Sequence, residues 1–304
     1  MERATKIGRW RKGGLRSLLA MGRRFDGVYM AAFYDRYGEA EWDRHERSAA
    51  HRVAFAVHCA FLGDHVQPGD LVLEAGAGAG RFTIELARLG ARVHVGDLSP
   101  VQVELNRQHV ADAGASSSVV GRDVLDICDL SRFEDGTFDT VVCYGGPLSY
   151  VRELADQALG ELVRVTKPGG HVLISVMSTL GTMRTFLPAL TEEGRRFGLA
   201  HNERIFETGE LDRETNNGHE MKMYRWSELS DLCQRHGELV AGAAANFLAA
   251  SHDPAPFDAL SEEEWDQLVS FELRLCREPG VLDAGTHILA AVRTPVPASD
   301  DGVP

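Results

Sequence analysis

Three alternating glycines between a strand and a helix constrain this chain more than any other feature. Residues 71–73 are typical of a short buried strand that runs into Glu74, and Gly76, Gly78 and Gly80 follow before a helical pattern begins. Glycines let the backbone approach a ligand closely, and the next helix offers its free N–H groups. The stretch therefore predicts a ligand-binding loop, with Glu74 facing a cation or an amino group.

The same loop lacks the dinucleotide-binding fingerprint. That fingerprint needs a third glycine three residues after the second one, but the two possible registers place Arg81 and Thr83 there. A nicotinamide-dependent oxidoreductase is therefore the weaker of the enzyme interpretations.

Strands and helices alternate on both sides of the loop. The alternation predicts an α/β fold with a doubly wound, mostly parallel sheet and helices on both faces. The expected strands are 71–73, 91–96, 118–121, 138–143, 171–176, 239–247 and 286–292, and the expected helices are 82–89, 99–113, 154–165, 227–235 and 261–277. Two stretches, 178–225 and 249–285, interrupt the rhythm and are expected to form caps.

The chain divides on this basis into a core with additions. The expected parts are a flexible basic arm at 1–24, an N-terminal helical lid at 25–69, a ligand-binding core at 70–177, a cap at 178–225, the rest of the core at 226–294 with its second cap at 249–285, and a tail at 295–304. The arm holds eight basic residues and one acid, and a solvated tail is the favoured interpretation of it.

Two acids stand where a nucleoside could be held. Asp97 ends the second expected strand, 21 residues after Gly76, where an acid can accept hydrogen bonds from a ribose diol. Asp123 follows the third expected strand, where a carboxylate can receive an adenine amino group. Each acid alone could be a solvated strand end, so the order and spacing carry the prediction.

In this order and spacing, residues 70–177 resemble the class I S-adenosylmethionine (AdoMet)-dependent methyltransferases. The resemblance implies a Rossmann-like seven-stranded sheet of order 3-2-1-4-5-7-6 with the last strand antiparallel. It also implies AdoMet as cofactor, with the glycine loop under the methionine and ribose and the backbone after the fourth strand near the methionine. The implied cofactor residues are Tyr34, Glu74, Gly76, Ala77, Gly78, Asp97, Leu98, Asp123, Val124, Tyr144 and Gly145.

The sequence lacks motifs of two methyltransferase subfamilies, which narrows the classes of methyl acceptor that we expect. Tyr144 to Pro147 lacks the Asp/Asn-Pro-Pro-aromatic motif of DNA amino methyltransferases and the Asp of metal-dependent catechol-type enzymes. The resemblance thus implies metal-independent, in-line transfer to an oxygen or nitrogen of a small molecule. A non-catalytic AdoMet-binding partner subunit stays an open alternative, as does the oxidoreductase.

The carboxyl ends of the parallel strands are where such sheets bind ligands, and both expected caps leave from that end. His219 and His287 fall on this side and are the candidate general bases, since histidine takes up a proton near neutral pH. Tyr34 could form a lid over the cofactor or simply pack. His51, His58 and His65 recur every seven residues, which is more typical of a polar helix face than of a zinc site.

Composition excludes several classes of partner. The formal net charge is −13, which disfavours non-specific nucleic-acid binding. Five cysteines without a CxxC pair indicate reduced thiols. No stretch has the length of a membrane span or the pattern of a signal peptide, so we expect a cytoplasmic protein. The oligomeric state is left open.

Overall fold

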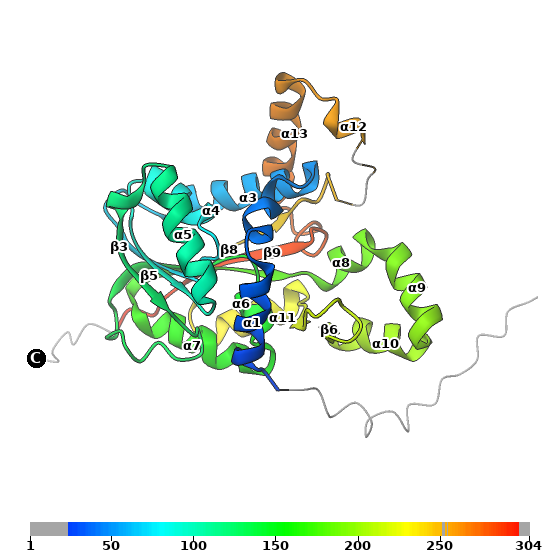
Figure 1. The fold of residues 1–304 in the computed structure, drawn as a ribbon, viewed down its shortest axis with the longest axis horizontal. Helices are drawn as coiled ribbons and strands as arrows, with labels where there is room; N and C mark the ends of the chain where they lie inside the picture. Colours follow the sequence, from blue (N-terminus) through cyan, green and yellow to red (C-terminus); the bar gives the residue numbers. More distant parts are fainter. Residues whose placement is uncertain (1–23, 251–252, 254, 298–304) are drawn as a thin grey trace, which may run out of the picture.

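The computed structural model describes residues 24–250, 253 and 255–297. Seven strands form one sheet in the order β3-β2-β1-β4-β5-β9-β8 (Figure 1). The first five are parallel, whereas β9 runs antiparallel to both β5 and β8. The predicted fold class and strand order are confirmed, with β9 and β8 as the seventh and sixth strands of the expected sheet.

The strands of this sheet and of a separate two-stranded ribbon have the following bounds. They are β1 Leu71–Ala75, β2 Arg92–Asp97, β3 Val119–Val124, β4 Phe138–Cys143, β5 Thr166–Met177, β8 Glu238–Ala245 and β9 His287–Arg293, with β6 Glu210–Leu211 and β7 Met221–Lys222 forming the ribbon.

Helices fill the connections between strands. They are α1 Gly27–Tyr37, α2 Ala40–Asp43, α3 Ala49–His65, α4 Arg81–Arg88, α5 Pro100–Asp112, α6 Pro147–Tyr150, α7 Ala155–Val165, α8 Thr179–Thr185, α9 Leu187–Phe197, α10 Leu199–Thr208, α11 Trp226–Gln234, α12 Ala255–Asp258 and α13 Glu262–Leu275, with short 3₁₀ helices η1 Arg44–Glu46, η2 Ser116–Ser118 and η3 Arg152–Leu154.

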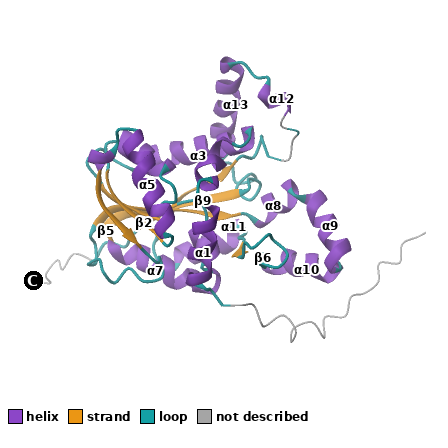
Figure 2. Cartoon of the chain, in the orientation of Figure 1, coloured by secondary structure: helices purple, strands orange, loops and turns teal. Residues whose placement is uncertain are grey.

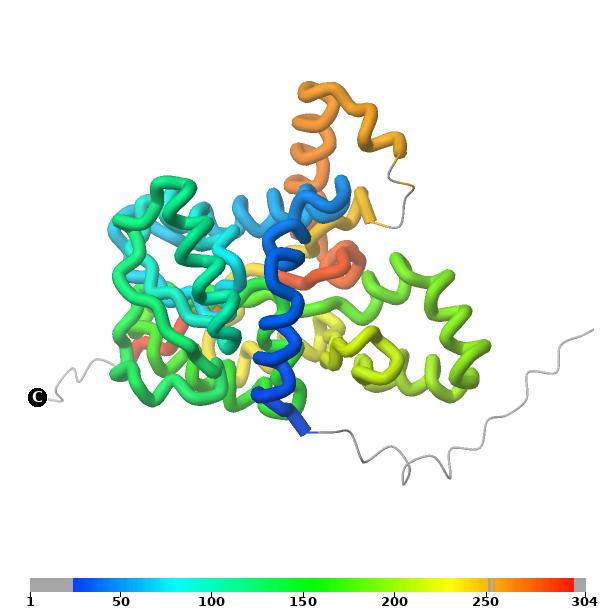
Figure 3. Tube along the Cα trace, viewed as in Figure 1, coloured from blue at the N-terminus to red at the C-terminus, as the bar shows by residue number. Residues whose placement is uncertain are grey.

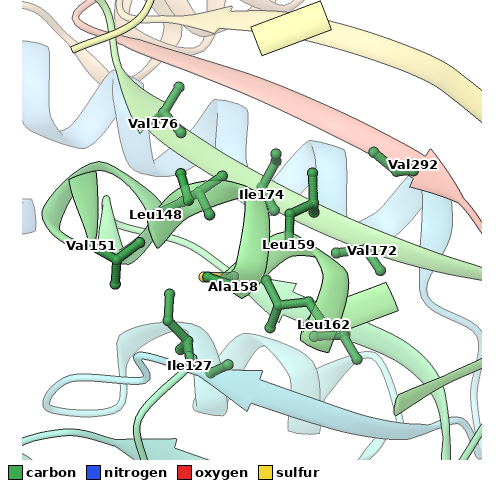
Figure 4. Packing of buried hydrophobic residues seen from close by; sticks show 14 of the residues in the cluster. Ile127, Leu148, Val151, Ala158, Leu159, Leu162, Val172, Ile174, Val176 and Val292 are labelled. Atoms are coloured by element: carbon green, nitrogen blue, oxygen red, sulfur yellow. The ribbon is translucent and has the colours of Figure 1, made fainter. Parts of the chain in front are cut away.

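The core lies on both faces of the sheet because side chains alternate along each strand. On β5, Val172, Ile174 and Val176 face a cluster with α6, α7 and α11, whereas Leu173 joins the opposite cluster with α3 and α4. Figure 4 shows the first cluster, in which Leu159 and Leu162 of α7 lie against β5. These side chains are fully buried, and two covered faces explain the near-continuous apolar runs of the strands.

Helix starts follow local capping chemistry. The Ser99 hydroxyl accepts a hydrogen bond of 3.1 Å from the N–H of Gln102, and Pro100 occupies the first turn of α5. Ser261 and Glu264 form a reciprocal capping box that starts α13.

The additions to the sheet extend from it in two directions. Helices α8, α9 and α10 form one projection, and α12 and α13 form another (Figures 2 and 3). The expected cap at 178–225 is thus mostly helical, a feature its mixed composition did not reveal. Helix α13 returns to pack on α3.

The division of the chain into arm, lid, core, caps and tail stays a prediction. The basic arm lies outside the described residues apart from Arg24, and most of the C-terminal tail lies outside them as well. Within the described parts of the chain, no helix combines the length and apolarity needed to cross a bilayer.

Candidate active site

The glycine-rich loop after β1 has a conformation that only glycine supports easily. Gly76 has a φ of +81°, and a Cβ there would lie 2.3 Å from Cγ of Pro147. The N–H groups of Gly76 and Ala77 donate to the carbonyl of Gly96 over 2.8 and 3.0 Å. The loop is therefore held flat between the ends of β2 and β4, with no room for a larger residue at its first glycine.

Asp97 ends β2 and is joined to this loop. Its Oδ2 accepts a hydrogen bond of 2.8 Å from the N–H of Gly78, and its Oδ1 accepts one of 2.8 Å from the N–H of Ser99. Burial raises the pKa of Asp97 to about 6, although these two hydrogen bonds oppose the shift. Each carboxylate oxygen keeps a lone pair that a ribose hydroxyl could use.

Glu74, one of the cofactor residues that the resemblance implies, lies behind the loop. Its carboxylate is buried and accepts a hydrogen bond of 2.5 Å from the Thr83 hydroxyl, which accepts one of 2.7 Å from the Asn106 amide. Burial raises the pKa of Glu74 to about 8. Its side chain therefore ties β1 to α4 and α5 from beneath, and it does not line the cavity described next.

A cavity lies over the loop at the carboxyl ends of β1, β2 and β4. The loops after these strands, the segment after β3 and the N-terminal helices enclose it. Its lining residues are Phe25, Met30, Tyr34, Glu41, Arg44, His45, Gly76, Ala77, Gly78, Ala79, Gly80, Arg81, Phe82, Asp97, Leu98, Leu125, Asp126, Ile127, Tyr144, Gly145, Pro147, Tyr150 and Val151. Of the eleven expected cofactor residues, all but Glu74, Asp123 and Val124 are in this set.

The place of Asp123 differs from the sequence expectation. Strand β3 is longer than expected and includes Asp123 and Val124, so the loop that reaches the cavity starts at Leu125. Asp123 instead pairs with His94 at 2.6 Å and with Arg132 at 2.8 Å, and Val124 is 55% exposed. Of the acids in and after β3, Asp126 lines the cavity and Asp123 does not, so the structure does not place Asp123 and Val124 where the sequence analysis expected them.

The N-terminal helices add a charged pair to the cavity. Arg44 of η1 and Glu41 of α2 form a salt bridge of 2.7 Å, and both line the cavity. The Arg44 guanidinium lies over the loop after β4, because a Cβ on Gly145 would be 3.0 Å from its Nη2. Its Nε is buried without a hydrogen-bond partner among the described residues. A further anionic acceptor group would satisfy it.

A second cavity of about 760 Å³ adjoins the first. Both caps, α3 and the start of β9 contribute to it. The two cavities share Arg44, His45, Phe82, Gly145 and Tyr150. The remaining lining residues are Arg47, Ser48, Ala49, Ala50, His51, Ala54, His58, Met177, Thr185, Phe186, Asn216, His219, Met221, Asn246, Ala249, Ala250, Phe257, Thr286 and His287.

His219 and His287, the two histidines expected near the acceptor, both line this second cavity. Burial and the Arg44 charge lower the pKa of His219 to about 4. Burial and the neighbouring His58 hold the pKa of His287 well below its ordinary value. Both imidazoles are therefore neutral at pH 7 and carry a lone pair that can accept a proton.

Aromatic residues of α1 enclose His219. Its ring centroid lies 4.2 Å from that of Phe33 and 6.1 Å from that of Tyr34. The Tyr29 hydroxyl donates to the carbonyl of Gly218 over 2.8 Å, which ties the first cap to α1. Tyr34 also lines the cofactor cavity, so it is a wall of that cavity and a packing residue together.

Polar residues in and beside the second cap, 249–285, have structural partners. The buried carboxylate of Glu272 accepts hydrogen bonds from the N–H groups of Phe247 and Leu248. Asn246 binds Thr286 through its side chain at 2.8 and 2.9 Å, which fixes the entry to β9 beside His287. Among the described residues, no cluster of three His, Cys, Asp or Glu side chains has metal-ligand geometry.

Sequence reasoning missed Asp126, Arg44, Glu41 and His45. Asp126 lies three residues beyond the acid that was chosen, and a longer third strand would have pointed to it. Arg44, Glu41 and His45 lie on short helices 30 or more residues before the glycine loop, and no motif marks them.

Residues 72–170 match the family described as a methyltransferase domain. A ubiquinone biosynthesis O-methyltransferase from Xanthomonas campestris pv. campestris is 33% identical over 117 residues, which cover 36% of this chain and 44% of that protein. A demethylmenaquinone methyltransferase from a Mycobacterium species is 36% identical over 124 residues, which cover 40% and 46%. The chain thus spans less than half the length of these curated relatives.

A solved structure shares the fold over more of the chain. The 1,6-didemethyltoxoflavin-N1-methyltransferase of Burkholderia thailandensis covers 88% of this chain and 88% of its own, with a TM-score of 0.52 and 16% identity. This likeness concerns the arrangement of strands and helices, and it extends beyond the 99 residues that the family matches.

Proposed function

We propose that this chain, which carries a class I AdoMet-dependent methyltransferase domain at residues 72–170, transfers a methyl group to an oxygen or nitrogen of a small molecule. One observation carries the proposal. The cavity over the glycine loop and the cavity under the caps share Arg44, Gly145 and Tyr150, so a donor and an acceptor could meet between them.

The residues of the first cavity fit the cofactor. Asp97 offers two acceptor oxygens for a ribose diol, Asp126 offers one side of an adenine site, and Leu98 and Ile127 offer apolar walls. The unpartnered Nε–H of Arg44 would donate a hydrogen bond to the methionine carboxylate at the end of the cavity near Gly145. The loop from Gly76 to Gly80 has no side chain larger than a methyl group, so it leaves the space between them open.

The cofactor, when bound, supplies a methyl group already activated by a sulfonium, so the protein has mainly to position and desolvate. The shared residues Phe82 and Tyr150 can exclude water from the junction of the two cavities. Neutral His219 and His287 are available to take a proton from an acceptor that carries one.

The size and place of the second cavity support a small-molecule acceptor. About 760 Å³ suits a compact organic molecule, and the lining comes mostly from the caps, helix α3 and the start of β9. The two curated relatives carry names that refer to quinone biosynthesis, which is also small-molecule chemistry.

Transfer of label from AdoMet tests the proposal directly. The full chain is incubated with AdoMet labelled in its methyl group and with a panel of phenols, carboxylic acids and amines. Label should pass to an organic acceptor and should not remain on the protein. A partner subunit without turnover would bind AdoMet but give no labelled product with any member of the panel.

A further inference from the structure

Helix α3 presents histidines to the second cavity. His51 and His58 both line it, and they lie two turns, or about 10 Å, apart on one helix face. His65, the next in the seven-residue series, instead contacts the rings of Phe61 and His171 and lies outside the lining. Two of the three histidines therefore belong to the site, and neither has been assigned a role there.

His58 has a fixed orientation. Its Nδ1 lies 2.7 Å from the carbonyl oxygen of Ala54, and a carbonyl can only accept, so Nδ1 carries the hydrogen. Nε2 therefore holds the lone pair. This atom is buried and has no partner among the described residues, and the whole side chain is 4% exposed. A buried acceptor without a donor is costly unless a ligand supplies one.

The ring of His58 lies close to residues of the first cavity. Its ring centroid lies 5.0 Å from that of Tyr144 and 5.4 Å from that of Phe82, two residues that line the first cavity. It also lies 5.8 Å from the ring of His287. His58 therefore lies where the second cavity borders residues of the first cavity.

Charge distinguishes the second cavity from the rest of the protein. Among the described residues, no Asp or Glu lines it, although the chain has 45 such residues and a net charge of −13. Arg44 is paired with Glu41, whereas Arg47 is exposed and forms no ion pair within 4.0 Å among the described residues, although its charge is near enough to lower the pKa of Glu41. Its Nη2 donates to the Tyr37 hydroxyl over 3.3 Å. The described lining thus offers a cation no carboxylate and presents one exposed arginine to an anion.

We propose that the second cavity binds a small anionic acceptor through Arg47 and directs the acceptor's nucleophilic hydroxyl group at Nε2 of His58. This assignment rests on the methyl transfer proposed above and adds the substrate class. An ammonium could also donate to Nε2, but the lining residues that the structure describes include no carboxylate to balance its charge.

Atoms and charges balance in the proposed methyl transfer. The acceptor O–H bond breaks and its proton moves to Nε2, an oxygen lone pair forms the new C–O bond, and the C–S bonding pair stays on sulfur as a neutral thioether. One positive charge leaves the sulfonium and one appears on His58. The charge of the buried site is unchanged, which makes a histidine with a lowered pKa workable as the base.

Equilibrium binding without AdoMet tests the charge preference. Calorimetry at pH 7.5 compares 4-hydroxyphenylacetate, neutral tyrosol and cationic tyramine, which share a phenol and differ in charge. We expect the acid to bind about five- to tenfold more tightly than tyrosol, with tyramine weakest. Arg47→Gln should remove the preference for the acid. Arg92→Gln, which removes the same charge at the amino end of β2, should keep it.

Comparison of 4-hydroxyphenylacetate with phenylacetate tests the hydroxyl contact. The hydroxyl should improve binding by about five- to tenfold in the wild type and in His65→Phe, but not in His58→Phe. His58→Gln, which keeps an acceptor of similar size, should retain part of the gain and guards against a folding defect.

Equal affinity across the charge series, absence of measurable binding, or a hydroxyl gain that survives in His58→Phe would overturn the inference. The proposed function fails separately, since AdoMet affinity is measured on the same samples. If the protein prefers the acid but does not bind AdoMet, the proposed anion site is supported and the proposed methyl transfer is contradicted.

Discussion

The backbone N–H of Gly78 donates a hydrogen bond of 2.8 Å to Oδ2 of Asp97, so the glycine loop after β1 and the acid at the end of β2 form one unit. The N–H of Ser99 binds the other carboxylate oxygen, at the start of α5. An acid fixed at both oxygens is pre-organised for a ribose diol and costs little ordering when the cofactor binds.

Replacement of Asp97 by alanine tests this unit. The change removes charge-assisted hydrogen bonds worth about 1.5–3 kcal/mol each and also frees the N–H of Gly78. We expect AdoMet affinity to fall at least tenfold, measured by calorimetry, while circular dichroism shows an intact fold. Unchanged affinity would remove Asp97 from the cofactor site.

A second pair of variants separates the two acids near β3. Asp126 lines the cavity, whereas Asp123 is paired with His94 and Arg132 outside it. Asp126→Ala should weaken AdoMet binding by several-fold, and Asp123→Ala should leave it within about twofold. The reverse order would restore Asp123 as the adenine residue and contradict the register of β3.

The two cap-side histidines allow a test of proton transfer. His219→Gln and His287→Gln keep a polar side chain of similar size, and AdoMet affinity should stay unchanged in both. If either is the base, kcat falls by about 10²–10⁴-fold. If both variants keep full turnover while His58→Gln does not, the acceptor's proton moves to His58 on α3. Full turnover in all three would mean that the reaction proceeds by positioning alone.

Glu74 should make the free energy of unfolding depend on pH. Burial raises its pKa to about 8, so the folded state binds the proton more tightly than the unfolded state does. The resulting stability is complete below the unfolded pKa and is lost as the pH rises through about 8. Between pH 7 and 8.5 the loss is ~1 kcal/mol.

Urea unfolding of the wild type and of Glu74→Gln measures this loss. The buried histidines have lowered pKa values in the folded state and add the same slope to both proteins, so the difference between the two slopes isolates Glu74. The wild type should lose stability faster than Glu74→Gln by that amount. Parallel slopes would show that Glu74 is ionised in the folded protein at neutral pH.

The sequence predicted those features that depend on local patterns. Strand and helix alternation predicted a mostly parallel sheet, and the family resemblance implied its strand order. Asp97 was found because its strand ends where the apolar run ends. Asp126 was missed because β3 carries polar residues such as Arg122 and Asp123, which hide where the strand stops. Polar residues can continue a strand wherever their side chains find partners, as Asp123 does with His94.

Contacts between distant segments escaped prediction. Arg44 reaches Gly145 and His58 reaches Tyr144 only because α2, η1 and α3 fold over the carboxyl ends of the strands. The seven-residue spacing of the histidines showed a common helix face. Only the structure shows that His58 on this face lines a cavity, whereas half-buried His65 contacts the rings of Phe61 and His171.

Competition between AdoMet and NAD for the full chain tests the central claim most directly. Calorimetry with AdoMet, S-adenosylhomocysteine and NAD under one set of conditions compares the two cofactor classes that the fold could serve. The loop has Arg81 where a dinucleotide site needs a glycine, so AdoMet and its demethylated product should bind and NAD should not. Tighter binding of NAD than of AdoMet would contradict the assignment of the first cavity, and with it the proposed methyl transfer.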